Sequence, residues 1–362
     1  MAIGSKYTTL DHEDIALCHK YRLSLTSAPR QSSFRVVAVI FYELLGVEEE
    51  HKRHHVVGAN DEPCYINGSI CAERAALVQL RFLPLKKISK VVITTDACNP
   101  IFPGMLCREF MSSHPYIDPH NMPIITAGSV CQNEACKLNI GTKASSSYMD
   151  KLENGCTSIK TNTGKYVHHW EVIKTTLPAL YPHPSPYTRL SASESIQVGK
   201  SFSNSVRLFT VGDKSNLSED EQKLVLETTK AAQNGDDRGE LHPIQYAAAV
   251  LFEDGSIETS CQRKSLEYGC SIDAVTQLLT SIEKKQKEKQ TTKPKILVQT
   301  DQFGIIHTPF ATARAFLSEF DDFNMEILVQ DLSDPPDHAD IGKFDVNDIA
   351  PSAPDMGDLW TE

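Results

Sequence analysis

One order of apolar runs and amphipathic segments occurs twice along the chain. In the first half, the periodicity predicts strand, helix, strand, helix and strand at residues 34–42, 72–82, 90–95, 107–113 and 122–126. In the second half, it predicts the same order at residues 246–252, 272–282, 295–299, 309–320 and 325–329. A repeated order of this kind predicts a tandem duplication of one α/β unit, with helices packed on a mixed sheet.

The length of 362 residues favours two domains, because single cores stop growing below this size. We expect the break within residues 184–206, where prolines give way to the serine-rich stretch 190–195. The predicted domains are therefore residues 1–195 and 205–362, and the first carries an insertion at about 128–168.

The apolar runs, the first residues and the net charge disfavour a membrane protein, a secreted protein and a nucleic-acid-binding protein. No run approaches the roughly 18 apolar residues needed to cross a bilayer, and the first residues lack the apolar core of a signal peptide. We therefore expect a cytoplasmic protein whose ten cysteines are thiols or metal ligands. A net charge of -11 disfavours nucleic acid as a partner, although a local basic groove stays possible.

Two short motifs carry chemistry. Cys71 stands two residues before Glu73 at the start of a predicted helix, and Pro103 and Cys107 mark the start of another. A Cys-x-Glu followed by Pro-Cys-x-x-Cys is the spacing with which zinc deaminases hold Zn²⁺ and leave one coordination position open. Gly104 occupies the position of the first cysteine of the second motif, so one ligand is missing.

The third ligand stays open at this point. Cys98 is the first candidate, because it lies in the loop between a predicted strand and the Cys107 helix. Cys64 is a second candidate, although a packing role suits it equally well. The remaining alternative is that zinc is held weakly or not at all.

With these motifs, the chain resembles cytidine deaminases of the two-domain form, in which a catalytic domain is joined to a degenerate copy of itself. Besides residues 70–76, the resemblance rests on Ser33-Phe34, Asn60-Asp61-Glu62 and Leu177-Pro178. It implies two three-layer α/β/α domains, a Zn²⁺ cofactor and a homodimer. It also implies hydrolytic deamination of cytidine or deoxycytidine, small nucleosides, as in pyrimidine salvage.

The resemblance implies a role for each matching residue. Glu73 would move protons, and Cys71, Cys107 and, tentatively, Cys98 would hold zinc. Arg74 would hydrogen-bond a thiolate. The expected substrate contacts are Phe34, Asn60, Glu62 and Ala72.

The second half lacks these groups. Asp273 and Val275 occupy the positions of Cys71 and Glu73. Because valine cannot transfer protons, we expect this half to be inactive. Two alternatives stay open for the whole chain, namely a deaminase of nucleotides or polynucleotides and a metal-free scaffold in which both halves are inactive.

Overall fold

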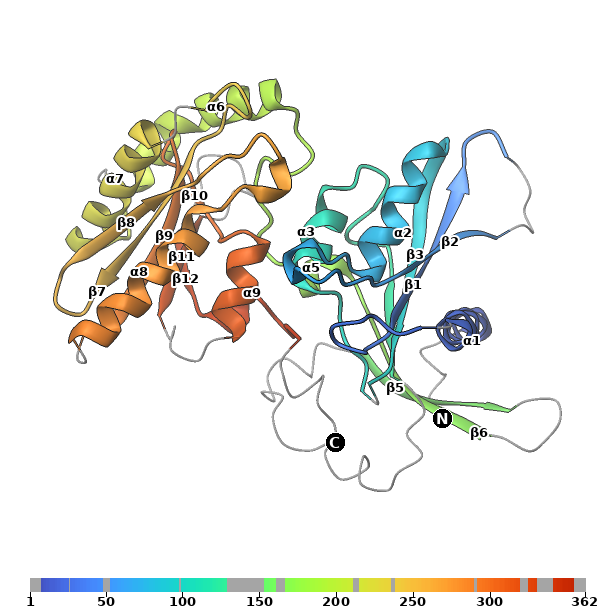
Figure 1. Ribbon diagram of the computed structural model, residues 1–362. Helices are drawn as coiled ribbons and strands as arrows, with labels where there is room; N and C mark the ends of the chain where they lie inside the picture. Colours follow the sequence, from blue (N-terminus) through green and yellow to red (C-terminus); the bar gives the residue numbers. More distant parts are fainter. Residues whose placement is uncertain are drawn as a thin grey trace, which may run out of the picture. The chain divides into compact units, whose positions relative to one another are not determined.

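The computed structural model describes residues 8–25, 27–47, 53–97, 99–128, 153–160, 167–210, 215–235, 238–289, 292–319, 325–330 and 341–354 (Figure 1). The chain divides into two compact units. The first consists of Met1–Leu180 together with Ser352–Glu362, and the second is Tyr181–Pro351. Of the expected insertion, residues 129–152 and 161–166 lie outside the described part.

The first unit contains a six-stranded mixed sheet. Its strands are β1 (Val36–Leu44), β2 (His54–Ala59), β3 (Leu85–Thr95), β4 (Ile124–Ala127), β5 (Glu153–Lys160) and β6 (Val167–Thr175). Their order is β2-β1-β3-β4-β6-β5. Only β3 and β4 run parallel, and every other neighbouring pair is antiparallel. The sheet therefore places the start of β1 beside the end of β3, with Val36 opposite Thr95.

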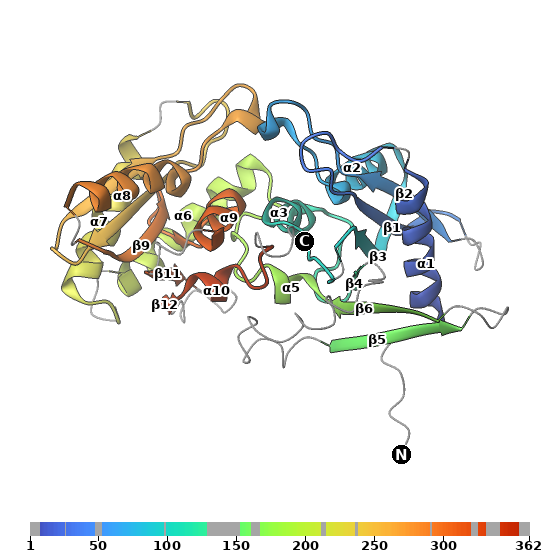
Figure 2. The same cartoon turned by 60° about the horizontal axis from the view of Figure 1, so that its bottom comes forward.

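Helices cover both faces of this sheet (Figure 2). On one face, Ile15 and Cys18 of α1 (Thr9–Ser24) pack against Val37 and Val39. Side chains alternate along a strand, so the neighbouring position of β1 points to the other face. There α2 (Ala72–Gln79) lies against β2, and it contacts α3 (Met105–Ser113). The shorter elements are η1 (Ile66–Gly68), η2 (Leu80–Phe82) and α5 (Leu177–Leu180).

The second unit has a sheet whose strand order repeats that of β2 to β6 in the first. Its strands are β7 (Tyr246–Phe252), β8 (Ile257–Cys261), β9 (Pro294–Asp301), β10 (Ile306–His307), β11 (Glu326–Gln330) and β12 (Ile341–Phe344). The order is β12-β11-β9-β7-β8, and β10 adds to β9. From β8 to β12, the strand directions repeat those from β2 to β6, with the one parallel pair between β9 and β11.

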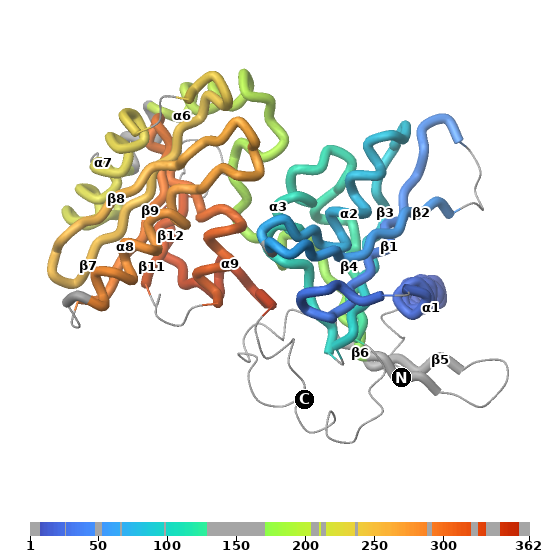
Figure 3. The backbone as a smooth tube through the Cα atoms, viewed as in Figure 1, coloured from blue at the N-terminus to red at the C-terminus, as the bar shows by residue number. Residues whose placement is uncertain are grey.

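Helices again lie on both faces of the second sheet (Figure 3). Leu224 of α7 (Glu219–Asn234) packs on the side of Ala249, whereas Leu278 of α8 (Ala274–Lys289) packs on the side of Ala248. The remaining helices are α6 (Ala192–Thr210), α9 (Ala311–Glu319), α10 (Val346–Ile349) and η4 (Tyr268–Cys270).

A helix occupies part of the range in which we expected the break between domains. Ser191 accepts a hydrogen bond from the backbone N–H of Glu194, and the Glu194 carboxylate accepts one from the backbone N–H of Ser191. This reciprocal pair is a capping box, which starts a helix. The serine-rich stretch is therefore the beginning of α6, and the division between units falls earlier, after Leu180.

Candidate active site

The candidate site is built at the starts of α2 and α3. Cys71 is the N-cap residue of α2, with an extended backbone and no capping hydrogen bond from its side chain. Helix α2 approaches the sheet closely at Gly58, where an added Cβ would lie 2.1 Å from the carbonyl oxygen of Ala72. Ala72 is fully buried at this contact. Because Gly58 has no side chain, the start of α2, and with it Cys71, can lie this close to the sheet.

The thiol of Cys107 meets Cys71 from α3. Gly104 is the N-cap of α3, and Cys107 follows in its first turn, fully buried. A hydrogen bond from the Cys107 thiol, together with the nearby Arg74 charge, lowers the pKa of Cys71 to about 6 against the effect of burial. The same hydrogen bond, with burial, raises the pKa of Cys107. The hydrogen bond and the Arg74 charge therefore favour the ionised form at Cys71 and the neutral thiol at Cys107.

The guanidinium of Arg74 stabilises this thiolate. Its Nη2 atom lies 3.8 Å from the sulfur of Cys71 and donates to the carbonyl of Ser69 at 3.3 Å. It also hydrogen-bonds Cys107. A cation in contact with both sulfurs favours their negatively charged forms.

Glu73 is a buried carboxyl beside the two sulfurs. Its exposed fraction is 3%, and it hydrogen-bonds Cys107. Burial and the neighbouring Cys71 thiolate raise the pKa of Glu73 to about 7. A carboxyl with this pKa can both accept and release a proton near neutral pH. The structure thus brings together four of the residues selected from the sequence: Cys71, Glu73, Arg74 and Cys107.

The donor set at this place fits zinc in part. Two hydrogen-bonded sulfur donors, with ionisation favoured at Cys71, suit the preference of Zn²⁺ for thiolates. Within the described residues, no group of three or more His, Cys, Asp or Glu side chains is placed to hold a metal ion. Cys98 lies outside the described residues. Cys64 is described, and its thiol is free and exposed.

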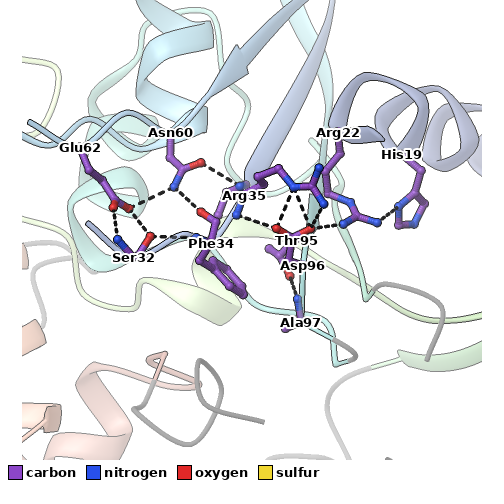
Figure 4. A network of polar contacts seen from close by, with 11 residues as sticks. His19, Arg22, Ser32, Phe34, Arg35, Asn60, Glu62, Thr95, Asp96 and Ala97 are labelled. Atoms are coloured by element: carbon purple, nitrogen blue, oxygen red, sulfur yellow. Dashed lines mark hydrogen bonds and ion pairs between the residues drawn. The ribbon is translucent and has the colours of Figure 1, made fainter. Parts of the chain in front are cut away.

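Three of the four expected substrate residues, Phe34, Asn60 and Glu62, form a second cluster at the start of β1 (Figure 4). The side-chain oxygen of Asn60 accepts from the N–H of Val36 at 2.8 Å, and its amide donates to the carbonyl of Phe34 at 2.9 Å. The same amide donates to Glu62 at 3.3 Å. Asn60 therefore fixes the backbone at Phe34 and orients Glu62.

The carboxylate of Glu62 is held by Ser32. The Ser32 N–H donates to Oε2 at 2.7 Å, and the Ser32 hydroxyl donates to Oε1 at 2.8 Å (Figure 4). The charge of Glu62 partly offsets the lowering of the Cys71 pKa. Sequence reasoning missed Ser32, because nothing in the sequence places it opposite Glu62.

A third group, centred on Asp96, was also missed. Asp96 follows β3 and accepts from the backbone N–H of Arg35 at 2.9 Å and from its Nε at 2.9 Å. It also pairs with Arg22 of α1, which lies beside His19 (Figure 4). The signal available in the sequence was an acidic residue directly after a buried strand. Asp96 thus links α1 to the start of β1 and the end of β3.

The matching place in the second unit has neither of the two thiols nor the buried glutamate. The isolated bridge between Arg263 and Ile272 precedes Asp273, as the bridge between Asp61 and Ile70 precedes Cys71. Asp273 caps α8 through the N–H of Thr276 at 2.9 Å. Val275 and Ala313, both fully buried, stand where the first unit has Glu73 and Cys107. Phe310 stands where it has Gly104, and packs edge-on against Tyr246.

The chain has only limited similarity to known proteins that the comparisons found. No protein-family model matches the chain, and no curated protein is similar to it. Among solved structures, a cytidine deaminase from Burkholderia pseudomallei is 16% identical, with a TM-score of 0.31, over 49% of this chain and 99% of that one. A cytidine deaminase from Mycobacterium tuberculosis is 19% identical, with a TM-score of 0.29, over 38% and 98%. One from Mycobacterium leprae is 14% identical, with a TM-score of 0.28, over 36% and 95%.

None of the helices in the described ranges is long and apolar enough to cross a membrane.

Proposed function

We propose that the first unit is a zinc-dependent hydrolytic deaminase that converts cytidine or deoxycytidine to uridine or deoxyuridine and ammonia. The observation that carries the proposal is the meeting of Cys71, Cys107, Glu73 and Arg74 at the starts of two helices. Two sulfur ligands, a buried carboxyl and a cation on the thiolate are the groups that this chemistry needs in one place.

Each residue has a role in the proposal. Cys71 and Cys107 would hold Zn²⁺, with Cys98 as the tentative third ligand, and Arg74 would keep Cys71 ionised. When bound, zinc supplies a positive charge that makes water a nucleophile near neutral pH. Glu73 takes a proton from the water that adds to C4 of the pyrimidine and passes it to ring N3. It then assists the departure of the C4 amine as ammonia.

The substrate would lie toward the start of β1. Phe34 offers an aromatic ring, and Glu62 offers a carboxylate to a sugar hydroxyl, with Asn60 holding both in place. The buried Ala72 forms part of the wall at the start of α2. A carboxylate at this end and the net charge of -11 favour a nucleoside over a nucleotide or polynucleotide.

The second unit is, in this proposal, a degenerate copy of the first. The shared strand order and the matching bridges support a duplication. Val275 offers no proton-transfer group, so the copy would be inactive. We extend the proposal to two chains that pair as a homodimer in the cytoplasm. Sedimentation equilibrium would test the pairing.

A metal-free scaffold is the second candidate, because the described residues place only two sulfurs at the site. The test is release of ammonia from cytidine, deoxycytidine, cytidine monophosphate and single-stranded DNA by wild type, Glu73→Gln and Val275→Ala. We expect turnover of the two nucleosides, its loss in Glu73→Gln and its retention in Val275→Ala. No turnover of any compound by wild type would favour the scaffold, and turnover of only the last two compounds would move the proposal to another substrate class.

A further inference from the structure

Arg108, the residue after Cys107, joins three separate parts of the chain. Its guanidinium is fully buried. It donates to the carbonyl oxygens of Pro103 at 2.6 Å, Leu180 at 2.7 Å and Ser352 at 2.6 Å. Pro103 directly precedes the N-cap of α3, and Leu180 ends α5. Ser352 is reached only after the whole of the second unit, yet it belongs to the first.

The second unit repeats this arrangement with Arg314 on α9. That guanidinium donates to the carbonyl oxygens of Pro309 at 2.7 Å, Ile349 at 2.8 Å and His183 at 3.0 Å, and also to Pro182 at 2.8 Å. Ile349 ends α10, as Leu180 ends α5. His183 lies just past the first stretch of the first unit and belongs to the second. Each arginine therefore bonds the end of a short helix in its own unit and a residue that the chain reaches just after the other unit.

The residues that supply the last carbonyl share an unusual backbone. Ser352 has a φ of 50° and His183 a φ of 49°, in the left-handed region that non-glycine residues rarely adopt. A conformation of this kind persists only where the surroundings stabilise it. In both cases the residue presents its carbonyl to a buried guanidinium, a contact that helps to stabilise this conformation.

We propose that Arg108 and Ser352 are positioning residues of the metal site in the first unit. By binding Pro103, Arg108 fixes the turn into α3, and Cys107 lies in the first turn of that helix. Arg108 also bonds Ser352, so the position of this turn depends in part on a segment that follows the second unit in the chain. This support would come from a segment of the first unit that the chain adds only after the second unit. The metal part of this inference rests on the proposed function.

The test uses two substitutions at each left-handed residue of the full-length chain. Glycine adopts a positive φ freely, whereas valine strongly resists it. Ser352→Gly therefore keeps the carbonyl in place, and Ser352→Val moves it. His183→Gly and His183→Val make the matched pair for Arg314 in the second unit.

The readout is titration with cobalt(II), followed by the sulfur-to-cobalt charge-transfer absorption, which reports thiolate ligation and not folding alone. We expect Ser352→Val to bind cobalt about tenfold more weakly, the loss that corresponds to about one weakened hydrogen bond to a charged group. Ser352→Gly and both His183 variants should bind as wild type does. Equal affinity in Ser352→Val and wild type, or an equal loss in His183→Val, would overturn the inference.

A second measurement separates this inference from the metal proposal. If wild type shows no charge-transfer absorption with cobalt, the zinc proposal fails. Amide hydrogen exchange over Met105–Ser113 then tests the positioning directly. Faster exchange in Ser352→Val than in Ser352→Gly supports the role of Ser352, and equal exchange overturns it.

Discussion

The guanidinium of Arg74 lies 3.8 Å from the sulfur of Cys71, one turn further along the same helix. This contact predicts that Arg74→Gln weakens zinc binding, because the Cys71 thiolate loses its neighbouring cation. We expect a loss of roughly 10-fold to 100-fold, the usual range for groups that hydrogen-bond a metal ligand. Competition with a chelator measures the affinity.

Arg74→Lys should retain part of the affinity, since it keeps the charge but not the planar fork of donors. Arg81→Gln is the matched control, because Arg81 is exposed beyond the end of α2. Equal zinc affinity in Arg74→Gln and Arg81→Gln would contradict a role for the guanidinium.

The close contact of α2 with the sheet gives a second prediction. In Gly58→Ala, the new Cβ would lie 2.1 Å from the carbonyl of Ala72 and 2.5 Å from the nitrogen of Ala76, so the helix has to move. We expect the free energy of unfolding to fall by about 1–3 kcal/mol, as for other overpacked sites. Gly239→Ala is the control, since no atom lies within 4 Å of its added Cβ. Urea denaturation gives both values, and equal stability of the two variants would refute the close packing.

The hydroxyl of Ser32 occupies an oxygen of Glu62 that a sugar hydroxyl would use. Ser32→Ala removes this competitor, and the backbone N–H of Ser32 still holds the carboxylate. We expect KM for cytidine to fall by about fivefold, the worth of one ordinary hydrogen bond, with kcat unchanged. Ser113→Ala, at an exposed serine that bonds the Phe110 carbonyl, should leave both constants unchanged. A higher KM in Ser32→Ala would mean that Ser32 supports substrate binding.

An ion cluster beneath α1 predicts how stability depends on pH. Burial opposes ionisation of Asp11, but hydrogen bonds from Lys90 and Lys174 outweigh it and lower the pKa of this carboxyl. A pKa lower in the folded than in the unfolded chain stabilises the fold above the unfolded value of about 3.9, and this contribution is lost as the pH falls below it. Wild type should therefore be more stable than Asp11→Asn at neutral pH.

Unfolding by urea across the acid range measures this difference. It should shrink progressively as the pH falls below about 4. Glu13→Gln, which removes an exposed charge from the same helix, controls for the net charge of α1. A difference that stays constant down to low pH would exclude the ionised Asp11 as its source.

The buried apolar runs predicted most of the fold. Each of the ten predicted strands and helices overlaps an observed element, as residues 34–42 overlap β1 and residues 72–82 overlap α2 and η2. Continuous burial along β1 and β9 explains this success. Strand β2 was missed because it lies at the edge of its sheet, where most of its residues are half-buried and no apolar run forms. Helix α1 was missed because Asp11 and Asp14 stand at buried positions of its inner face.

The sequence predicted those site residues that stand at the starts of predicted helices. Cys71, Glu73 and Cys107 could be placed together because both motifs open helices on one face of the sheet. Contacts between distant loops were not predictable. Ser32 reaches Glu62 across 30 positions, and Arg35 reaches Asp96 across 61. Pairings of this kind depend on strand register, which the sequence pattern did not fix.

We propose that Cys71 and Cys107 bind zinc with a third ligand outside the second motif. Zinc content per chain tests it most directly, in wild type, Cys98→Ala and Cys98→Ala with Gly104→Cys. The last variant is feasible, because no atom lies within 4 Å of an added Cβ at Gly104, which caps α3 three residues before Cys107. We predict one zinc in wild type, its loss in Cys98→Ala and its return in the double variant. Wild type without zinc, or a double variant that stays without it, would contradict the account.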